Sequence, residues 1–386
     1  MSLQFSQRAI DIPPSPIRKL LPLELEARKR GVHIYKLNIG QPDIPTPEVF
    51  FRSLNSDLPQ VLGYGPSQGL PEFQKAVADY YKRIGLPVEP HEVMATIGGS
   101  EALFFAFLAV ANPGDEIIVF EPFYTNYIGF AIYAGVTLVP YTTRAENGFH
   151  LPAREEIERL VTPRTRAILV CSPNNPTGTV LTRAEMEMVL DIAQQRDLFV
   201  ISDEVYEHIV FDGEPHRSVA TSPLLAERSV VISSFGKTFH TTGWKIGYAC
   251  APRAISAELR KVHQFMVFAV NTPGQHAVAR YLEDAAPYET LAAFYQAKRD
   301  RFAAGLAHTR FRLLPCEGTY FLLADYSAIS DLPDAEFAQK MIVDYGVAVI
   351  PVSGFYERPF DARVVRFCFA KKDETLSAAL ERLHAV

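Results

Sequence analysis

Five short apolar runs divide the middle of the chain, and they constrain its fold more than any other feature of the sequence. They occupy residues 116–120, 136–140, 166–170, 198–202 and 229–233. Each is rich in branched apolar residues, which is typical of a buried strand. The segment 184–197, between two of the runs, has apolar residues at helical spacing instead. Strands that alternate with helices need right-handed crossovers, so the sequence predicts an α/β fold with a mainly parallel sheet covered on both faces.

The pattern changes from about residue 285 onward. Helical and strand-like segments are mixed there, in the order 288–309, 317–326, 334–344, 346–351 and 364–370, followed by a final helix. This mixture predicts a smaller α+β domain. An amphipathic helix is also expected at 15–31, introduced by Ser15 and Pro16, and its packing with the C-terminal part would make the small domain discontinuous. The predicted domains are 45–285 for the large one, and 1–44 with 286–386 for the small one.

Charge and cysteine content narrow the classes of function. The formal net charge is -6, so no excess of cations is available to neutralise phosphates, and a nucleic-acid partner is not expected. No apolar run reaches the roughly 18 residues of a membrane span, and residues 1–16 lack the apolar core of a signal peptide. The four cysteines are scattered without a CxxC spacing. We therefore predict a cytoplasmic protein with reduced thiols, no membrane association and no metal site.

Polar and aromatic residues follow four of the predicted strands. They are Tyr124, Asn175, Asp203 and Lys237. Open α/β sheets bind ligands outside the carboxyl ends of their strands. We therefore expect these side chains to meet in one crevice.

Lys237 and Asp203 suggest the chemistry of that crevice. A lysine at an apolar strand end is a candidate Schiff-base nucleophile, because burial or a neighbouring cation lowers its pKa from about 10.4 toward neutrality; a solvated surface lysine is the alternative. A carboxylate at a buried strand end needs a partner, and the ring nitrogen of a cofactor would be one. A helix N-cap is the alternative for Asp203. Tyr206, one turn later, would either approach the same site or pack in the core.

A phosphate site is indicated by the segment 97–110, which reads as a helix that starts at Gly98, Gly99 and Ser100. Free N–H groups and the helix dipole attract anions there, although such a start is often a simple cap. Ser234 and Lys245 could add phosphate ligands. The sequence contains neither a GxxxxGK[ST] motif nor a strand followed by GxGxxG, so a nucleotide bound in those ways is not expected.

Arg366 completes the pattern, because it interrupts an apolar strand-like segment, 364–370. Arginine is seldom buried without a partner and suits bidentate binding of a carboxylate. An edge-strand arginine that faces water is the alternative. A phosphate pocket, an acid for a ring nitrogen, an imine-forming lysine and a carboxylate clamp together describe pyridoxal 5'-phosphate and an amino acid.

Over nearly its whole length the chain resembles the fold-type I, class I/II aminotransferases. The motifs come in the order of that family: NIGQPDIPTP, YGPSQG, GGSEAL, EPFYTNY, SPNNPTG, SDEVYEH, SSFGKTFHTTGWKIGY and VVRFCFA. The second half is most similar to the methionine and kynurenine (glutamine transaminase-like) aminotransferases. The first half is more similar to the bacterial group that resembles aspartate aminotransferase. The resemblance implies a large domain with a mainly parallel, seven-stranded sheet plus a smaller α+β domain.

The resemblance also implies a role for each matching residue. Lys237 would bind the cofactor as an imine and carry the proton of the substrate α-carbon, and Asp203 would hold the ring nitrogen protonated. Tyr206 and Asn175 would contact the phenolic oxygen of the cofactor, and Tyr124 would stack on its ring. The phosphate would be bound by Gly99, Ser100, Ser234, Lys245 and the neighbouring subunit's Tyr64. The substrate carboxylate would be bound by Gly40, Asn175 and Arg366. Many relatives have arginine where Lys245 stands; lysine keeps the charge but loses the bidentate fork.

We therefore predict a homodimer with shared active sites that moves an amino group between an amino acid and a 2-oxo acid by a ping-pong mechanism. A dicarboxylate substrate would need a second cation, but the matching segment 262–273 contains Phe265, Met266 and Phe268 and no arginine. An apolar pocket that includes Ile17 and Phe268 favours methionine, aromatic residues, kynurenine or glutamine. Two alternatives stay open: an aspartate-type enzyme that uses Arg18, and a β-lyase acting on cysteine conjugates.

Overall fold

The computed structural model describes residues 4–15, 18–56, 60–221, 227–283, 286–358 and 360–386. A seven-stranded sheet forms the centre, with the order β2-β8-β7-β6-β5-β3-β4. Its strands are β2 (Val93–Thr96), β3 (Glu116–Glu121), β4 (Thr137–Thr142), β5 (Thr165–Cys171), β6 (Phe199–Asp203), β7 (Ser229–Ser234) and β8 (Gly247–Cys250). The strands from β3 to β7 pair in parallel, and β8 is antiparallel to both of its neighbours. The predicted α/β class with a mainly parallel sheet is confirmed.

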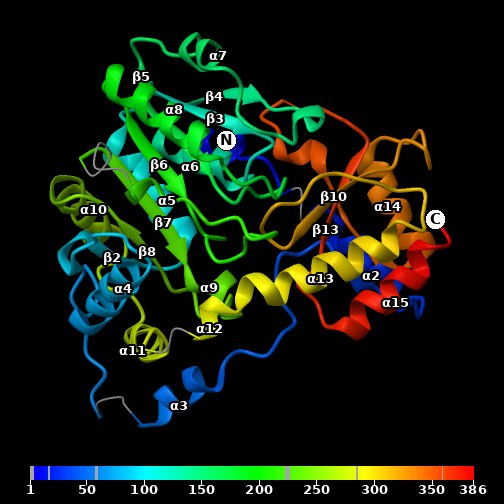
Figure 1. The fold of residues 1–386 in the computed structure, drawn as a ribbon, viewed down its shortest axis with the longest axis horizontal. Helices are drawn as coiled ribbons and strands as arrows, with labels where there is room; N and C mark the ends of the chain where they lie inside the picture. The colour runs from blue at the N-terminus through cyan, green and yellow to red at the C-terminus, as the bar shows by residue number, and fades with distance from the viewer. Residues whose placement is uncertain (1–3, 16–17, 57–59, 222–226, 284–285, 359) are drawn as a thin grey trace.

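Helices cover both faces of this sheet (Figure 1). They are α4 (Pro71–Arg83), α5 (Gly99–Val110), α6 (Asn126–Ala134), α7 (Arg154–Glu158), α8 (Arg183–Gln195) and α10 (Arg253–Met266). The short helix α9 (Phe235–Thr238) follows β7 directly, and α11 (Thr272–Tyr281) packs on α4 and on α3 (Glu48–Ser56), which projects away from the sheet (Figure 1). Alternate residues of a strand point to opposite faces. In β3, Ile117 and Val119 belong to the apolar cluster that includes α5 and α10, whereas Ile118 joins the cluster that includes α4 and α8. A parallel sheet buried on both faces explains why its strands read as continuous apolar runs.

The start of α8 shows how local sequence sets an element boundary. The Thr182 hydroxyl accepts a hydrogen bond from Glu185 N, and the Glu185 carboxylate accepts one from Thr182 N, so the helix begins with a capping box. The apolar side chains of the helix then fall on one buried face: Met186, Val189, Leu190, Ile192 and Ala193. The helix predicted at 184–197 is therefore present, with its end two residues earlier at Gln195.

The C-terminal part packs around a second, antiparallel sheet with the order β12-β13-β10-β9. Its elements are β9 (Arg312–Leu313), β10 (Phe321–Asp325), β12 (Ile350–Pro351), β13 (Val364–Cys368), α13 (Leu291–Leu306), α14 (Asp334–Tyr345) and α15 (Asp373–Leu383). The N-terminal segment joins this part: β1 (Tyr35–Lys36) pairs in parallel with β11 (Val347–Ala348), and α2 (Leu21–Lys29) packs on α14. In Figure 1, α13 runs from the neighbourhood of α9 to the C-terminal helices and so joins the two sheets along one side.

Several boundaries differ from the sequence expectations. The predicted helix 288–309 is divided into α12 (Ala286–Glu289) and α13, because Thr290 interrupts it. The helix expected at 15–31 is a single 3-10 turn, Arg18–Leu20, followed by α2, and residues 16–17 lie outside the described ranges. The segment 317–326 is extended only from Phe321, and its first residues form a loop. Within the described ranges no helix combines the length and the apolar character that crossing a membrane requires.

Candidate active site

Lys237 lies where β7 ends and the single-turn helix α9 begins. Ser234 caps this turn, with its hydroxyl 3.4 Å from Gly236 N. The lysine is half-buried, and its Nζ donates a hydrogen bond of 2.8 Å to the carbonyl of Gly40. Burial, assisted by the nearby cation Arg366, lowers the pKa of Lys237 to about 8. With this pKa about a tenth of the amine is unprotonated at pH 7, which is the form that a nucleophile or a general base needs.

Asp203 ends β6 and is almost completely buried, with 4% of its surface exposed. Burial raises the pKa of its carboxyl to about 6, although the Tyr127 hydroxyl donates a hydrogen bond of 2.6 Å to Oδ2 and so favours the ionised form. The residues after Asp203 form turns rather than a helix, so a role as helix N-cap does not describe it. A buried carboxylate at a strand end is suited to accept a hydrogen bond from a protonated ring nitrogen.

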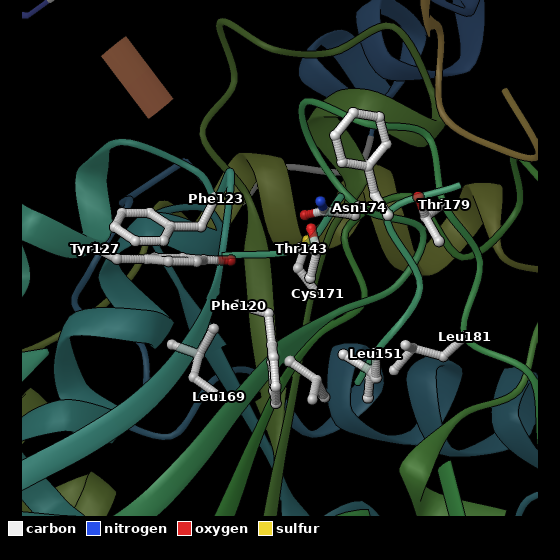
Figure 2. Close-up of a pocket in the computed structure, with 12 residues that line it drawn as sticks. Phe120, Phe123, Tyr127, Thr143, Leu151, Leu169, Cys171, Asn174, Thr179 and Leu181 are labelled. Atoms are coloured by element: carbon white, nitrogen blue, oxygen red, sulfur yellow. The ribbon is translucent and has the colours of Figure 1, made fainter. Parts of the chain in front are cut away.

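Tyr127 is the residue of this group that the sequence analysis missed. It lies one turn after Tyr124 in α6, and its ring packs edge-on against Tyr124 at 5.7 Å between centroids. The signal was present in the spacing, because a second tyrosine follows Tyr124 by three residues; in the structure Tyr124 precedes α6, and Tyr127 N donates a hydrogen bond of 3.0 Å to its carbonyl. A small cavity of about 30 Å³ lies beside Tyr127 and Cys171 (Figure 2), which is room for one or two water molecules and not for a cofactor.

The start of α5 forms an anion-binding cradle. Gly98 has a φ of 74°, which favours glycine, and a Cβ at this position would lie 3.3 Å from Nζ of Lys245. A Cβ added to Gly99 would lie 3.0 Å from Val205 Cγ2 and 3.6 Å from Ser234 Cβ. The Lys245 ammonium group and Ser234 therefore both lie beside the two glycines at the N-terminus of this helix. This arrangement fits a phosphate group.

Arg366 lies in β13, between β12 and β10, with 1% of its surface exposed, so it is not an edge-strand arginine that faces water. Its Nη1 donates to Asn175 Oδ1 at 2.6 Å, and its Nη2 donates to the Asn38 carbonyl at 3.0 Å. Burial lowers its pKa to about 10, so the group stays charged at neutral pH. Nε has no hydrogen-bond partner among the described residues. A buried guanidinium that meets only neutral oxygens is suited to receive a carboxylate.

Aromatic rings fix the plane of this guanidinium. The Arg366 Cζ lies 3.9 Å from the ring centroid of Phe321 and 4.9 Å from that of Phe355. The Tyr320 hydroxyl donates to the Gly40 carbonyl at 3.1 Å, the same oxygen that accepts from Lys237. Tyr320 and Phe321 were also missed by the sequence analysis, because the pairing of β10 with β13 that brings Phe321 near Arg366, and the hydrogen bond from Tyr320 to Gly40, join distant parts of the chain.

The structure brings several of the predicted site residues together in one network. Gly40 contacts Lys237, and Asn175 contacts Arg366. Electrostatic contacts also join Tyr206 to Arg366 and to Asp203. The Tyr124 hydroxyl forms a hydrogen bond with Ser100.

Other predicted residues lie elsewhere in the single chain. Tyr64 is 88% exposed, and its ring contacts Phe268, which is 48% exposed. Phe265, at 92%, is exposed near them in the sequence. Lys245 is exposed as well, although its Nζ reaches Gly98. Ile17 lies outside the described residues.

A second buried polar group lies behind Asp203. Ligand atoms of Glu204, Glu207 and His216 come within 4.8 Å of one another. His216 Nε2 lies 2.9 Å from Glu204, and hydrogen bonding to that carboxylate raises the pKa of His216 against the effect of burial. Burial raises the pKa of Glu207. The group therefore contains an ion pair between His216 and Glu204 beside the buried carboxyl of Glu207.

Comparison with known proteins gives a consistent result. The profile of the family described as aminotransferase class I and II matches residues 32–383. A methionine aminotransferase of Escherichia coli (strain K12) is 42% identical over 356 residues, 90% of each chain. An aspartate/prephenate aminotransferase of Thermus thermophilus is 34% identical, over 99% of this chain and 98% of its own. A crystal structure of an E. coli protein with a reported methionine aminotransferase function superposes with a TM-score of 0.94, at 38% identity over 100% of both chains.

Proposed function

The chain belongs to the class I and II aminotransferases, which depend on pyridoxal phosphate, and from this premise we propose how its residues carry out the transfer and which substrates it takes. The observation that carries the proposal is the buried Arg366, which meets only neutral oxygens while Lys237, with its lowered pKa, lies nearby in the same network. An amino acid offers a carboxylate for the first and an α-amino group for the second. The donor amino acid and the acceptor 2-oxo acid would occupy the same groups in turn, as a ping-pong mechanism requires.

We assign the cofactor contacts to the groups that the fold places at the strand ends. The cofactor, when bound, supplies an electron sink for the substrate α-carbon. Asp203 would accept a hydrogen bond from the protonated ring nitrogen, and Tyr124 would stack on the ring. Tyr206 and Asn175 would donate to the phenolic oxygen. The phosphate would be held by Gly99, Ser100, Ser234 and Lys245.

The proton transfer at the substrate is assigned to Lys237. Its amine has a pKa of about 8, so it can accept a proton from the α-carbon and release it again near neutral pH. Arg366, with Asn175 and Gly40, would hold the substrate carboxylate so that the α-carbon faces this amine. Fixing that geometry lowers the entropic part of the barrier.

We propose that two chains associate and share their active sites. The support is an exposed apolar group in two segments, made up of Val61, Leu62, Tyr64, Phe265, Met266 and Phe268, all at least 48% exposed. Such a surface is typical of an interface, and Tyr64 would then reach the phosphate bound by the other chain. A division into a large domain, 45–285, and a small domain, 1–44 with 286–386, would place the catalytic groups between them. The four unpaired cysteines suit a reducing, cytoplasmic location.

The proposed donors have apolar, sulfur-containing or aromatic side chains, and include kynurenine and glutamine. The support is the absence of an arginine in 262–273 and the higher identity with the methionine aminotransferase, 42%, than with the aspartate/prephenate enzyme, 34%. The test compares kcat/KM for methionine and phenylalanine with that for aspartate, each at saturating oxo acid. A preference for aspartate of tenfold or more, about 1.4 kcal/mol, would show that Arg18 or another cation serves a distal carboxylate. Pyruvate release from a cysteine conjugate without any acceptor would instead favour the β-lyase.

A further inference from the structure

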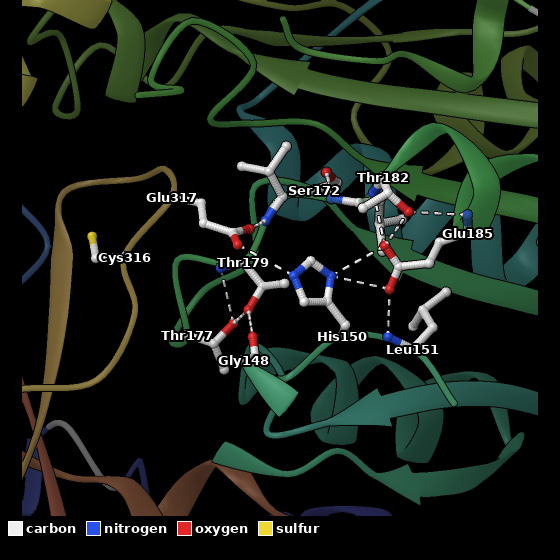
Figure 3. Close-up of polar contacts among 12 residues, drawn as sticks. Gly148, His150, Leu151, Ser172, Thr177, Thr179, Thr182, Glu185, Cys316 and Glu317 are labelled. Carbon is white, nitrogen blue, oxygen red and sulfur yellow. Dashed lines mark hydrogen bonds and ion pairs between the residues drawn. The ribbon is translucent and has the colours of Figure 1, made fainter. Parts of the chain in front are cut away.

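His150 lies between two carboxylates that belong to different parts of the chain (Figure 3). Its Nδ1 is 3.1 Å from both oxygens of Glu185, at the start of α8. Its Nε2 is 3.2 Å from Oε1 of Glu317, in the loop before β10. We call these three side chains the His150 clamp. It joins the part of the chain around the large sheet to the C-terminal part.

The contacts fix the charge of the clamp. Both ring nitrogens face carboxylate oxygens, so both must carry a proton, and hydrogen bonding to Glu185 and Glu317 raises the pKa of His150 to about 10. Against the effect of burial, the bond from His150 lowers the pKa of both glutamates. No other charged group is among the main causes of the His150 shift. Cys316, the other titratable group of the 314–318 loop, has its pKa raised to about 12 by burial and stays neutral.

The carboxylates of Glu185 and Glu317 also accept hydrogen bonds from backbone N–H groups. Glu185 accepts from Leu151 N at 2.6 Å, and Glu317 accepts from Val180 N at 2.8 Å. The position of Glu317 is therefore set jointly by His150 and by the loop that precedes α8. If the imidazolium were removed, two carboxylates would face each other across the vacated position, and their repulsion would push Glu317 away from Glu185.

The loop that carries Glu317 is pressed against the loop that carries Asn175. The backbone N–H groups of Glu317 and Gly318 both donate to the Gly178 carbonyl, at 3.1 and 2.8 Å. A Cβ added to Gly178 would lie 2.9 Å from the Gly318 carbonyl oxygen, so there is no space for a side chain between the two backbones. A shift of Glu317 would therefore move both loops.

These two loops supply the groups around the proposed carboxylate site. Asn175, three residues before Gly178, contacts Arg366 at 2.6 Å. Tyr320, three residues after Glu317, donates to the Gly40 carbonyl that also accepts from Lys237. We propose that His150 is a positioning residue for this site: its charge holds Glu317 and, through the paired loops, aligns Asn175 and Tyr320 with Arg366 and Gly40. The inference rests on the carboxylate-binding role proposed above for Arg366.

The test replaces His150 with glutamine in the holoenzyme and measures steady-state kinetics with phenylalanine well below the melting temperature. We expect KM to rise roughly tenfold, the loss of about one charge-assisted hydrogen bond, while kcat changes less than threefold, because Lys237 and the cofactor contacts are retained. His150→Arg, which keeps a charged donor for both glutamates, should restore most of the KM. The matched control is His276→Asn on α11, where a histidine lies 3.0 Å from the partly exposed Glu72; its KM should equal that of the unchanged enzyme.

A double variant separates positioning from simple stabilisation. Glu317→Gln removes the repulsion that follows the loss of His150, so the KM of His150→Gln with Glu317→Gln should be lower than the product of the two single effects predicts. A lower melting temperature with unchanged KM, or strictly additive effects, would overturn the positioning role. Arg366→Gln separates a failure of the proposed carboxylate site from a failure of the positioning role of His150. If it leaves KM unchanged, the proposed carboxylate site is wrong; if it raises KM and His150→Gln does not, only the inference about His150 is wrong.

Discussion

Replacement of Arg366 tests the proposed binding of the substrate carboxylate more directly than any other change in the site. Arg366→Gln removes the charge, and Arg366→Lys keeps the charge but removes the planar fork. The guanidinium is buried, and its only polar partners among the described residues are the neutral oxygens of Asn175 and Asn38. Solvent cannot take its place, so the full interaction with a ligand carboxylate should be lost in the glutamine variant.

The magnitude follows from the number of bonds. A hydrogen bond to a charged group contributes about 1.5–3 kcal/mol, and a bidentate pair makes two, which gives about 3–6 kcal/mol. This corresponds to roughly 10²–10⁴ in the dissociation constant. The lower end of this range applies if the removal of a buried charge is itself favourable and so offsets part of the lost binding free energy. Arg366→Lys should lose about one of the two bonds and weaken binding roughly tenfold to a hundredfold.

The assay is a titration of the holoenzyme with an unreactive acid, 3-phenylpropionate, followed through the absorbance of the bound cofactor. The control ligand is 3-phenylpropanamide, which has the same shape and no charge. We expect the glutamine variant to lose at least a hundredfold in affinity for the acid and less than threefold for the amide. If the affinities for the acid and the amide fall equally, the substitution has distorted the pocket, and the result does not support carboxylate binding by Arg366. A loss below threefold for the acid would refute the role of Arg366.

Three further changes test the groups on the other side of the substrate. Lys237→Ala should still bind the cofactor but lose turnover. Borohydride treatment should then form no covalent adduct between this variant and the cofactor. Peptide mapping that finds an adduct on another lysine would contradict this. Asp203→Asn should slow abstraction of the α-proton by roughly 10²–10⁴-fold, and an unchanged single-turnover rate would exclude the proposed role. Tyr127→Phe removes a donor that favours ionised Asp203, so the pKa of that carboxyl should rise above about 6 and the acidic limb of the pH profile should move to higher pH; an unmoved limb would show that Tyr127 has no influence on the acid.

The parts of the fold that depend on local pattern could be predicted from the sequence. The five apolar runs coincide with β3 to β7. Strands β3, β5, β6 and β7 are mostly buried, and a strand buried on both faces must be apolar throughout; the edge strand β4 is only partly buried. β2 and β8 were missed, since Val93–Thr96 and Gly247–Cys250 are short and contain small or polar residues. Only their pairing with each other and with β7 makes them strands. Pairing of this kind is a long-range property that no short window of sequence contains.

The candidate site likewise has some residues that the sequence could predict and some contacts that it could not. Residue types at strand ends pointed to Lys237 and Asp203, and the structure adds what surrounds them. The hydrogen bond between Lys237 and Gly40 joins positions 197 residues apart, so no local motif could indicate it. Tyr64 and Phe268 show the opposite limit: both are exposed in the single chain, and a single sequence does not specify the second chain that we propose covers them.

The balance of charge around the site explains why these residues belong together. Lys371 is a further buried cation, and its Nζ donates to the Gln41 carbonyl at 2.7 Å and approaches the Ile39 carbonyl at 3.4 Å, on either side of Gly40. Arg366 and Lys371 are therefore two buried cations close to Lys237, and the carboxylates in the same region are those of Asp203 and of Glu101, which interacts with the exposed Lys245. A buried positive charge is costly unless an anion balances it. A phosphate group carries nearly two negative charges and a substrate carboxylate carries one, so the two anions that an amino-acid aminotransferase must bind are those that this arrangement requires.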